Sequence, residues 1–201
     1  MQDKYGTGRD LVYCYPNSWV LKNFLNIREQ EKLDEAEVEF TQYRLANFKY
    51  IPISEFSLET WKSLHFYLFQ DIYEWAGEVR TVKITKDSTV FAMPMQIESF
   101  AQMLFRKMKM DAFLCNLERG SFVERLAYYF SELNMCHPFR EGNGRSQRLL
   151  FELIAINAGY VLNWLKVEKN KWVAANVSAV TGGTAELVKL FEVVVEEIPL
   201  K

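Results

Sequence analysis

The segment that follows Gly144 restricts the fold of this chain more than any other. Five large apolar residues recur there at close helical spacing: Leu149, Leu150, Leu153, Ile154 and Ile156. A helix that is apolar on nearly every side has to be covered on every side, so it belongs at the centre of a helical domain. Gly159 is placed to end this helix, because glycine adopts the left-handed backbone of a C-terminal cap without strain.

Helical periodicity recurs on both sides of that segment. Ser57 can cap a helix whose apolar residues return every three or four positions, and Gly77 follows as a stop signal. The same pattern runs through 122–133, just before the central segment. Two further helices are expected near 167–180 and 184–197.

One stretch departs from this pattern. In 79–92, valine, isoleucine and threonine alternate with charged residues around a Lys-Asp-Ser turn, which predicts a short β-hairpin. A lone hairpin is marginally stable, so it must lie on the helices, either as a flap over a site or as a connector. Residues 1–20 predict an irregular arm. We therefore predict an all-α bundle with a single β-hairpin, in one domain spanning 1–201.

Composition excludes several classes of protein. The 201 residues are 49% hydrophobic and 15% aromatic, which is typical of a folded globule. The net charge is −2, without the basic excess that a nucleic-acid binder carries, so we expect no nucleic-acid partner.

Cellular location is also constrained. The three cysteines show neither a disulfide framework nor metal-ligand spacing, which favours a reducing cytoplasm. We expect no membrane partner, because no apolar run is long enough to cross a bilayer. The first residues lack a signal peptide pattern. Export by a specialised secretion system, which reads other signals, stays open.

The run His-Pro-Phe-Arg-Glu-Gly-Asn-Gly-Arg-Ser-Gln-Arg at 137–148 carries the chemistry. Its glycine-rich turn opens the central helix and exposes backbone amides that can bind phosphate oxygens. Arg145 and Arg148 stand in the first turn, where the helix dipole already supplies positive charge. A bound polyanion would resolve that conflict, and arginine binds phosphate through two parallel hydrogen bonds. The alternative is a pair of solvated surface charges.

Two residues beside the turn suit catalysis. His137 has an unperturbed pKa of roughly 6.5, so it can abstract a proton from a hydroxyl near neutral pH. Glu141 can hold Mg²⁺ against phosphate oxygens, or it can simply stabilise the helix start. We expect Phe139 to anchor the loop in the core and His65, inside an apolar helix, to be structural.

At every fixed position, residues 137–148 resemble the signature of Fic proteins, H-P-F-x-[D/E]-G-N-G-R-x-x-R. Residues 73–80 look like the segment that leads into the Fic flap, and 83–92 look like the flap itself. The resemblance implies a Fic-fold helical bundle and a protein adenylyltransferase, an enzyme that transfers AMP from ATP to a protein hydroxyl. His137 would then deprotonate a Tyr, Ser or Thr of the target, and Glu141 would coordinate Mg²⁺.

The same resemblance implies the remaining site residues. The backbone amides of Gly142, Asn143 and Gly144 would hold the phosphates. Arg145 would engage the β-phosphate and Arg148 the γ-phosphate.

The flap also contributes by resemblance. Lys86 and Asp87 would lie near the nucleotide, while the strand edge of the flap would align the target protein. Asn176 stands at a suitable distance along the chain for an adenine-side contact.

Proteins of the Fic family differ in the residue at the position of Gly144 and in whether they contain an inhibitory helix. Doc kinases carry a lysine where this chain has Gly144, so glycine favours AMP transfer over phosphoryl transfer. Many Fic proteins contain an inhibitory helix, [S/T]-x-x-x-E-[G/N], but no Ser or Thr here is followed by glutamate four residues later. The resemblance therefore implies a bacterial toxin whose Arg148 is blocked by a separate small antitoxin that carries this helix.

Two alternatives remain from the residues and the resemblance. One is a nucleotide-binding regulator of cell division that has lost catalysis, against which the intact His137 and Glu141 argue. The other is phosphoryl or phosphocholine transfer on the same fold, which Gly144 disfavours.

Overall fold

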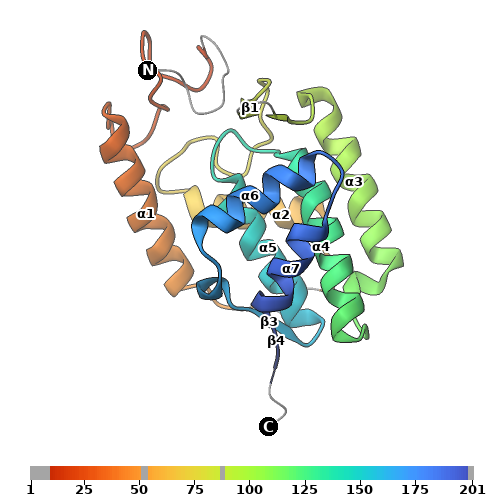
Figure 1. The fold of residues 1–201 in the computed structure, drawn as a ribbon. Coiled ribbons are helices and arrows are strands. Elements are labelled where there is room, and N and C mark those ends of the chain that lie inside the picture. The colour runs from red at the N-terminus through yellow and green to blue at the C-terminus, as the bar shows by residue number, and fades with distance from the viewer. Residues whose placement is uncertain (1–9, 51–53, 87–88, 199–201) are drawn as a thin grey trace.

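The computed structural model describes residues 10–50, 54–86 and 89–198, which fold mostly into α-helices (Figure 1). The helices are α1 Gln30–Ala46, α2 Leu58–Phe69, α3 Pro94–Met110, α4 Arg119–Cys136, α5 Asn143–Asn157, α6 Lys169–Val180 and α7 Ala185–Val194. Two short 3₁₀ turns are η1 Ala112–Leu114 and η2 Trp164–Lys166. The strands are β1 Thr85–Lys86, β2 Thr89–Val90, β3 Tyr160–Leu162 and β4 Val195–Glu197.

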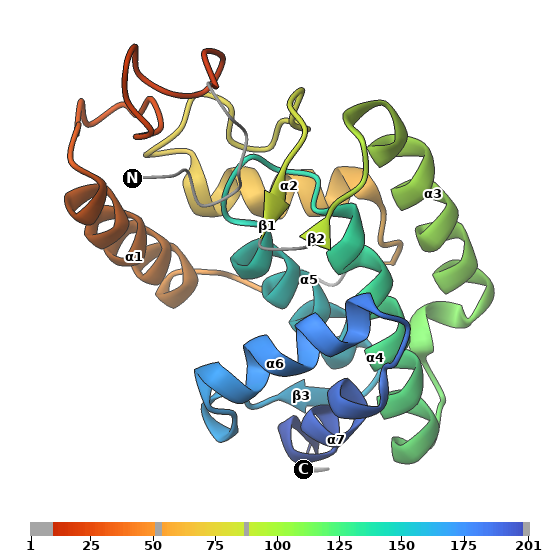
Figure 2. The same cartoon turned by 45° about the horizontal axis from the view of Figure 1, so that its top comes forward.

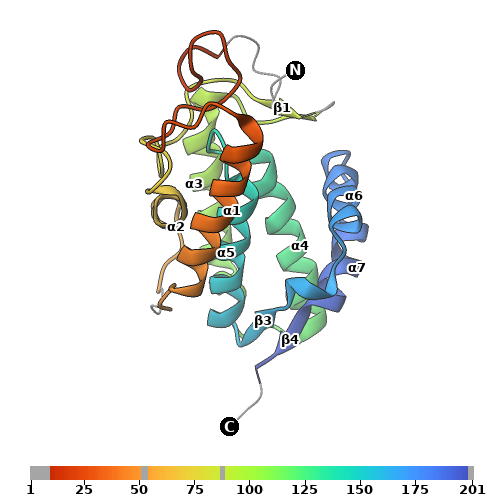
Figure 3. The same cartoon turned by 90° about the vertical axis from the view of Figure 1, so that its left-hand side faces the viewer.

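Helix α5 lies at the centre, as its apolar sequence predicts. It packs against α2 on one side and α4 on the other (Figure 2). The side view places α1 and α2 to one side of α5 and α4, and α6 and α7 to the other (Figure 3). Leu150 and Ile154 have no exposed surface, whereas Ile156, near the end of the helix, is partly exposed. The all-α fold is confirmed.

Helix α2 begins where the sequence predicts and ends earlier. Ser57 caps it in a capping box with Thr60. The helix stops at Phe69, and the chain then turns back on itself until the amide of Gly77 donates a hydrogen bond to His65 Nδ1 at 2.9 Å. A Cβ on Gly77, whose φ is +81°, would lie 2.9 Å from Phe66 Cβ, so this return to the helix requires glycine.

The C-terminal region contains a strand pair that the sequence analysis did not predict. Helix α7 ends at Val194, short of the expected 184–197, and the chain continues as β4, antiparallel to β3. The central helix ends at Asn157, and Gly159, with φ +91°, then reverses the chain into β3. Three residues per strand are too few to show an alternating pattern in sequence, so only the folded chain reveals this pair.

The expected hairpin forms from β1 and β2, with Thr85 paired to Val90 and Lys86 to Thr89. Its tip, 87–88, lies outside the described residues. The hairpin and the irregular segment that precedes α1 lie at the same end of the molecule (Figure 1). The sequence analysis gave no bounds for α1 or α3, the remaining two helices.

Across the described ranges, none of the helices combines the length and the apolar character needed to cross a membrane.

Candidate active site

The loop between α4 and α5 is closed by its own side chains. Helix α4 ends at Cys136, and the next residue, His137, turns the chain sharply with a φ of +42°. Asn143 then spans the loop: its Oδ1 accepts from the amide of Phe139 at 2.8 Å, and its Nδ2 donates to the Phe139 carbonyl at 2.7 Å. Phe139 is fully buried, as predicted. The Asn143 side chain is therefore committed to the loop, and only its backbone can serve a ligand.

The two glycines of the motif differ in what they do. Gly142 has φ +77°, and a Cβ there would lie 2.3 Å from Phe69 Cζ, so the fold itself demands glycine. Gly144 is exposed, and a Cβ there would meet nothing within 4 Å. The fold does not require glycine at this second position.

The start of α5 presents backbone amides. The Gly142 amide donates to Glu141 Oε1 at 2.8 Å. Within the part of the chain that the structure describes, the amides of Asn143, Gly144 and Arg145 donate no hydrogen bond, as the first amides of a helix do. These three amides, together with the positive end of the helix, form a site for an anion.

The tautomer of His137 is set by one hydrogen bond. Its Nδ1 lies 2.9 Å from the carbonyl of Asn134, which can only accept, so Nδ1 carries the proton and Nε2 carries the lone pair in the neutral ring. The ring is 8% exposed and stacks on Phe91 of the hairpin, with the centroids 3.8 Å apart. Burial, aided by the nearby charges of Arg80 and Lys86, lowers the pKa of His137 to about 3. The imidazole is therefore neutral at pH 7.

The two arginines occupy different environments. Arg145 makes an ion pair with Glu37 of α1, and its Nη2 lies 3.7 Å from Glu141 Oε1. Arg148 is half-buried and has no ion pair within the described residues. Burial lowers the pKa of Arg148, and the positive charge of Arg145 lowers it further. We expected both arginines to need a bound polyanion; in the folded chain Glu37 already balances the first, and only the second fits that expectation.

Glu141 stabilises the helix start, one of the two roles considered for it. It accepts the Gly142 amide and lies near Arg145, with 8% of its surface exposed. No group of three or more His, Cys, Asp or Glu side chains that could hold a metal ion occurs among the described residues. A divalent ion at Glu141 would thus need phosphate oxygens as further ligands, which is how Mg²⁺ is commonly held.

The other predicted site residues are placed differently. Lys86, in β1, is exposed, and its positive charge contributes to the lowered pKa of His137. Asp87 falls outside the described residues. Asn176, in α6, is half-buried and donates a hydrogen bond to the Trp172 carbonyl of its own helix at 2.8 Å. An adenine-side contact of Asn176 stays a prediction.

His65 is structural, as expected. Its Nδ1 accepts from the Gly77 amide, so Nε2 is the protonated nitrogen and donates to the Glu141 carbonyl at 2.9 Å. The ring stacks between Phe69 and Phe139, with centroid distances of 4.6 and 3.8 Å. Burial lowers its pKa to about 3. His65 thus pins the motif loop to the turn after α2.

Three charged residues around the site were not assigned from the sequence: Glu37, Arg80 and Asp10. Arg80 is 1% exposed and donates to the carbonyls of His137 at 2.8 Å, Val82 at 2.7 Å and Ala92 at 2.6 Å. It therefore ties both ends of the hairpin to the histidine. The sequence carries no signal for these roles, since single charged residues within polar segments are ordinarily solvated.

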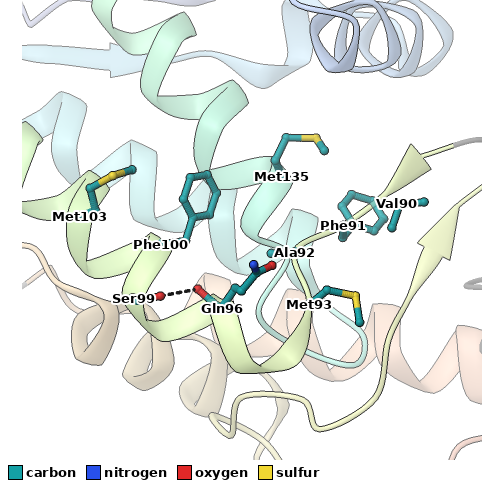
Figure 4. Close-up of a pocket in the computed structure, with 9 residues that line it drawn as sticks. All are labelled: Val90, Phe91, Ala92, Met93, Gln96, Ser99, Phe100, Met103 and Met135. Atoms are coloured by element: carbon teal, nitrogen blue, oxygen red, sulfur yellow. Dashed lines mark hydrogen bonds between the residues drawn. The ribbon is translucent and has the colours of Figure 1, made fainter.

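A groove of about 630 Å³ lies beside the hairpin, between β2, α3 and Met135 of α4 (Figure 4). Its apolar wall includes Met93, Phe100 and Met103, with Gln96 at its middle. Phe91 contributes to this groove and also stacks on His137. The groove and the histidine are therefore neighbours that share one side chain.

Comparison with known proteins places this architecture in a family. Residues 55–155 match the model of the Fic/DOC family. The chain is 41% identical over 98% of its length to "Probable protein adenylyltransferase Fic" of Escherichia coli K12, covering 98% of that protein.

Solved structures agree. BepC, a VirB-translocated effector of Bartonella tribocorum with bound AMPPNP, matches with a TM-score of 0.87 at 25% identity, over 93% of this chain and 97% of that one. The ADP-bound N-terminal Fic domain of a Bartonella quintana effector matches with a TM-score of 0.86 at 28% identity, over 92% and 94%. This chain belongs to the Fic/DOC family.

Proposed function

We propose that this chain, as a single Fic domain over 1–201, transfers AMP from ATP to a Tyr, Ser or Thr hydroxyl of a target protein. One observation carries the proposal: His137 Nδ1 donates to the Asn134 carbonyl, which leaves Nε2 as the unprotonated nitrogen, and His137 lies in the loop that leads into the open amides at the start of α5. Relatives named as protein adenylyltransferases support the same activity.

The proposed reaction uses His137 as the base. His137 Nε2 accepts the proton of the target hydroxyl, and the oxygen attacks the α-phosphorus of ATP. A new P–O bond forms as the bond to the pyrophosphate leaving group breaks. Glu141 would hold Mg²⁺, which supplies positive charge to the phosphate oxygens.

Binding of the triphosphate is assigned to the start of α5. The backbone amides of Gly142, Asn143 and Gly144 would hold the phosphates, and the Gly142 amide would leave its present acceptor, Glu141 Oε1, to do so. Arg145 would contact the β-phosphate and Arg148 the γ-phosphate.

The hairpin would present the target. We assign Lys86 and Asp87 to the nucleotide side of the flap and Asn176 to the adenine. The target would pair with the edge of the flap as an added strand, because main-chain hydrogen bonds recruit an extended segment with little sequence demand.

A biological role is proposed with this activity. The chain would act in the bacterial cytoplasm as a toxin restrained by a separate antitoxin, with cell filamentation as one outcome. Arg148, which has no ion pair within the described residues, is the group that an antitoxin glutamate would engage. Expression of the chain alone should then arrest growth, and co-expression of the partner should relieve the arrest.

One experiment tests the activity. The chain is incubated in a bacterial lysate with Mg²⁺ and ATP labelled on either the α- or the γ-phosphate, beside a His137→Ala variant. Label on protein from α-labelled ATP only, lost in the variant, supports AMP transfer. Label from the γ-phosphate would indicate a kinase, and nucleotide binding without transfer would indicate a regulator; either result would refute the proposal.

A further inference from the structure

Glu37 lies in α1, far from the motif in sequence and against it in the fold. It is 5% exposed, and its carboxylate accepts hydrogen bonds from the Tyr73 hydroxyl and from Arg145 Nη2. Arg145 follows it by 108 positions along the chain. Burying a carboxylate costs free energy unless hydrogen-bond donors surround it. The burial of Glu37 beside the motif therefore calls for an explanation from its contacts.

The contacts of Arg145 show what the carboxylate does. The guanidinium carbon lies 4.7 Å from the centroid of the Phe69 ring, so the group is held against an aromatic face. Only Nη2 donates a hydrogen bond within the part of the chain that the structure describes. The other N–H groups of the guanidinium stay available to a ligand.

Glu37 cannot easily turn away. The Tyr73 hydroxyl holds its other oxygen, and Tyr73 is itself 1% exposed and stacks on Trp75 at 4.3 Å. Arg148, one helical turn beyond Arg145, has no such clamp in the described ranges. The first arginine is thus fixed before any ligand arrives, whereas no carboxylate among the described residues fixes the second.

We propose that Glu37 is a positioning residue that orients Arg145 toward the triphosphate of the nucleotide. This inference rests on the proposed function. Glu37 engages one edge of the guanidinium and leaves the remaining donors open, so the contact orients the arginine and does not occupy it. Fixing a charged donor in advance removes the cost of ordering it during the reaction.

The test uses Glu37→Gln, which keeps the size of the side chain and removes its charge. We expect kcat for AMP transfer to fall roughly 10- to 100-fold, because misplacement by about 1 Å has costs of that order. The dissociation constant of ATP, measured by calorimetry, should change by less than about threefold, since the variant also removes a negative charge near the phosphates. Tyr73→Phe, which removes one hydrogen bond and no charge, should cause a smaller fall in kcat.

A second comparison separates positioning from a structural role. If Glu37 acts through Arg145, Glu37→Gln should lower kcat no further in an Arg145→Ala background. An equal loss in both backgrounds would overturn the proposal. An unchanged kcat in Glu37→Gln alone would also overturn it. A raised kcat would overturn it too, because it would show that Glu37 competes with ATP for Arg145.

The readout of orientation does not depend on turnover. The side-chain ¹⁵N signals of Arg145 should shift on addition of AMPPNP in the wild type, and this shift should be lost in Glu37→Gln. If the wild type transfers no AMP, the proposed function fails while this comparison still decides the role of Glu37. An identical shift in both proteins would refute it.

Discussion

The two glycines at the start of α5 differ at the scale of a single Cβ. At Gly142 both the backbone angle and the Phe69 ring exclude a side chain, and at Gly144 neither does. The fold accounts for the first glycine. At the second, the fold leaves open space beside the helix start.

Alanine substitutions should separate these two purposes. Gly142→Ala should lower the free energy of unfolding by roughly 2–4 kcal/mol, because it adds left-handed strain and a clash in the core. Gly144→Ala should raise it by about 0.5–1 kcal/mol, because alanine is the better helix former. Urea denaturation of both variants measures this. Similar losses of stability in the two would contradict the argument.

The two histidines share a property that makes the fold sensitive to acid. Burial lowers the pKa of both His65 and His137 to about 3, while an unfolded histidine titrates near 6.5. Between these values the unfolded chain binds more protons, so the free energy of unfolding falls as the pH drops below about 6.5. Glu37 and Glu152, whose pKa values burial raises, act in the opposite direction.

His65→Gln isolates one of these contributions. Each neutral buried histidine adds up to about 1.4 kcal/mol per pH unit to the slope of unfolding free energy against pH. The slope between pH 5 and 6 should therefore be smaller in the variant by about that amount, whatever its stability at pH 7. Urea denaturation at the two pH values measures the slope. An unchanged slope would mean that His65 is protonated in the folded protein.

At the scale of elements, the hairpin is held by the side chain of Arg80 as well as by the pairing of its own strands. Its strands have two residues each, too few for independent stability. Arg80 bonds the carbonyls of Val82 and Ala92, on either side of the hairpin, and that of His137. The hairpin and His137 therefore share one buried anchor.

Arg80→Lys should separate flap placement from nucleotide binding. A lysine ammonium cannot reach the three carbonyls that the guanidinium spans. We expect transfer to the target to fall about tenfold or more, with little change in the ATP dissociation constant measured by calorimetry. Lys83→Ala, in the same segment and exposed, serves as the control. Full transfer by Arg80→Lys would show that the anchor is dispensable.

At the scale of the whole molecule, the segment before α1 is tied to the motif loop. Arg140 Nε donates to Asp10 Oδ2 at 2.7 Å, and both side chains are almost fully buried. Asp10 also accepts the amides of Val12 and Tyr13 through Oδ1. This contact joins residues 130 positions apart.

Asp10→Asn should destabilise the protein by about 3–5 kcal/mol, because it removes a buried carboxylate that pairs with the buried Arg140. The exposed pair of Lys32 and Glu29 is the matched control, and Lys32→Gln should cost less than about 1 kcal/mol. Urea denaturation compares the two variants. Equal effects would show that the buried pair contributes no more than a surface pair.

Local pattern predicted much of this fold and of its site. The periodicity around Leu150, the Ser57 cap and the valine-threonine alternation of 79–92 all depend on neighbours within a few residues, so the sequence displays them directly. The motif itself, residues 137–148, is contiguous, which is why the sequence displays His137 and Arg148 together as candidate site residues. The strand pair β3–β4 left no such pattern.

The sequence did not predict which residue pairs with each buried charged side chain. The sequence by itself determined a central apolar helix, a β-hairpin and a histidine a few residues before a cationic helix start. Only the folded chain decided that Glu37 holds Arg145, that Arg80 anchors the hairpin and that Asp10 meets Arg140. The physical reason is that a buried charge is paired by whichever segment the packing of the core brings against it, and that segment can lie anywhere in the sequence.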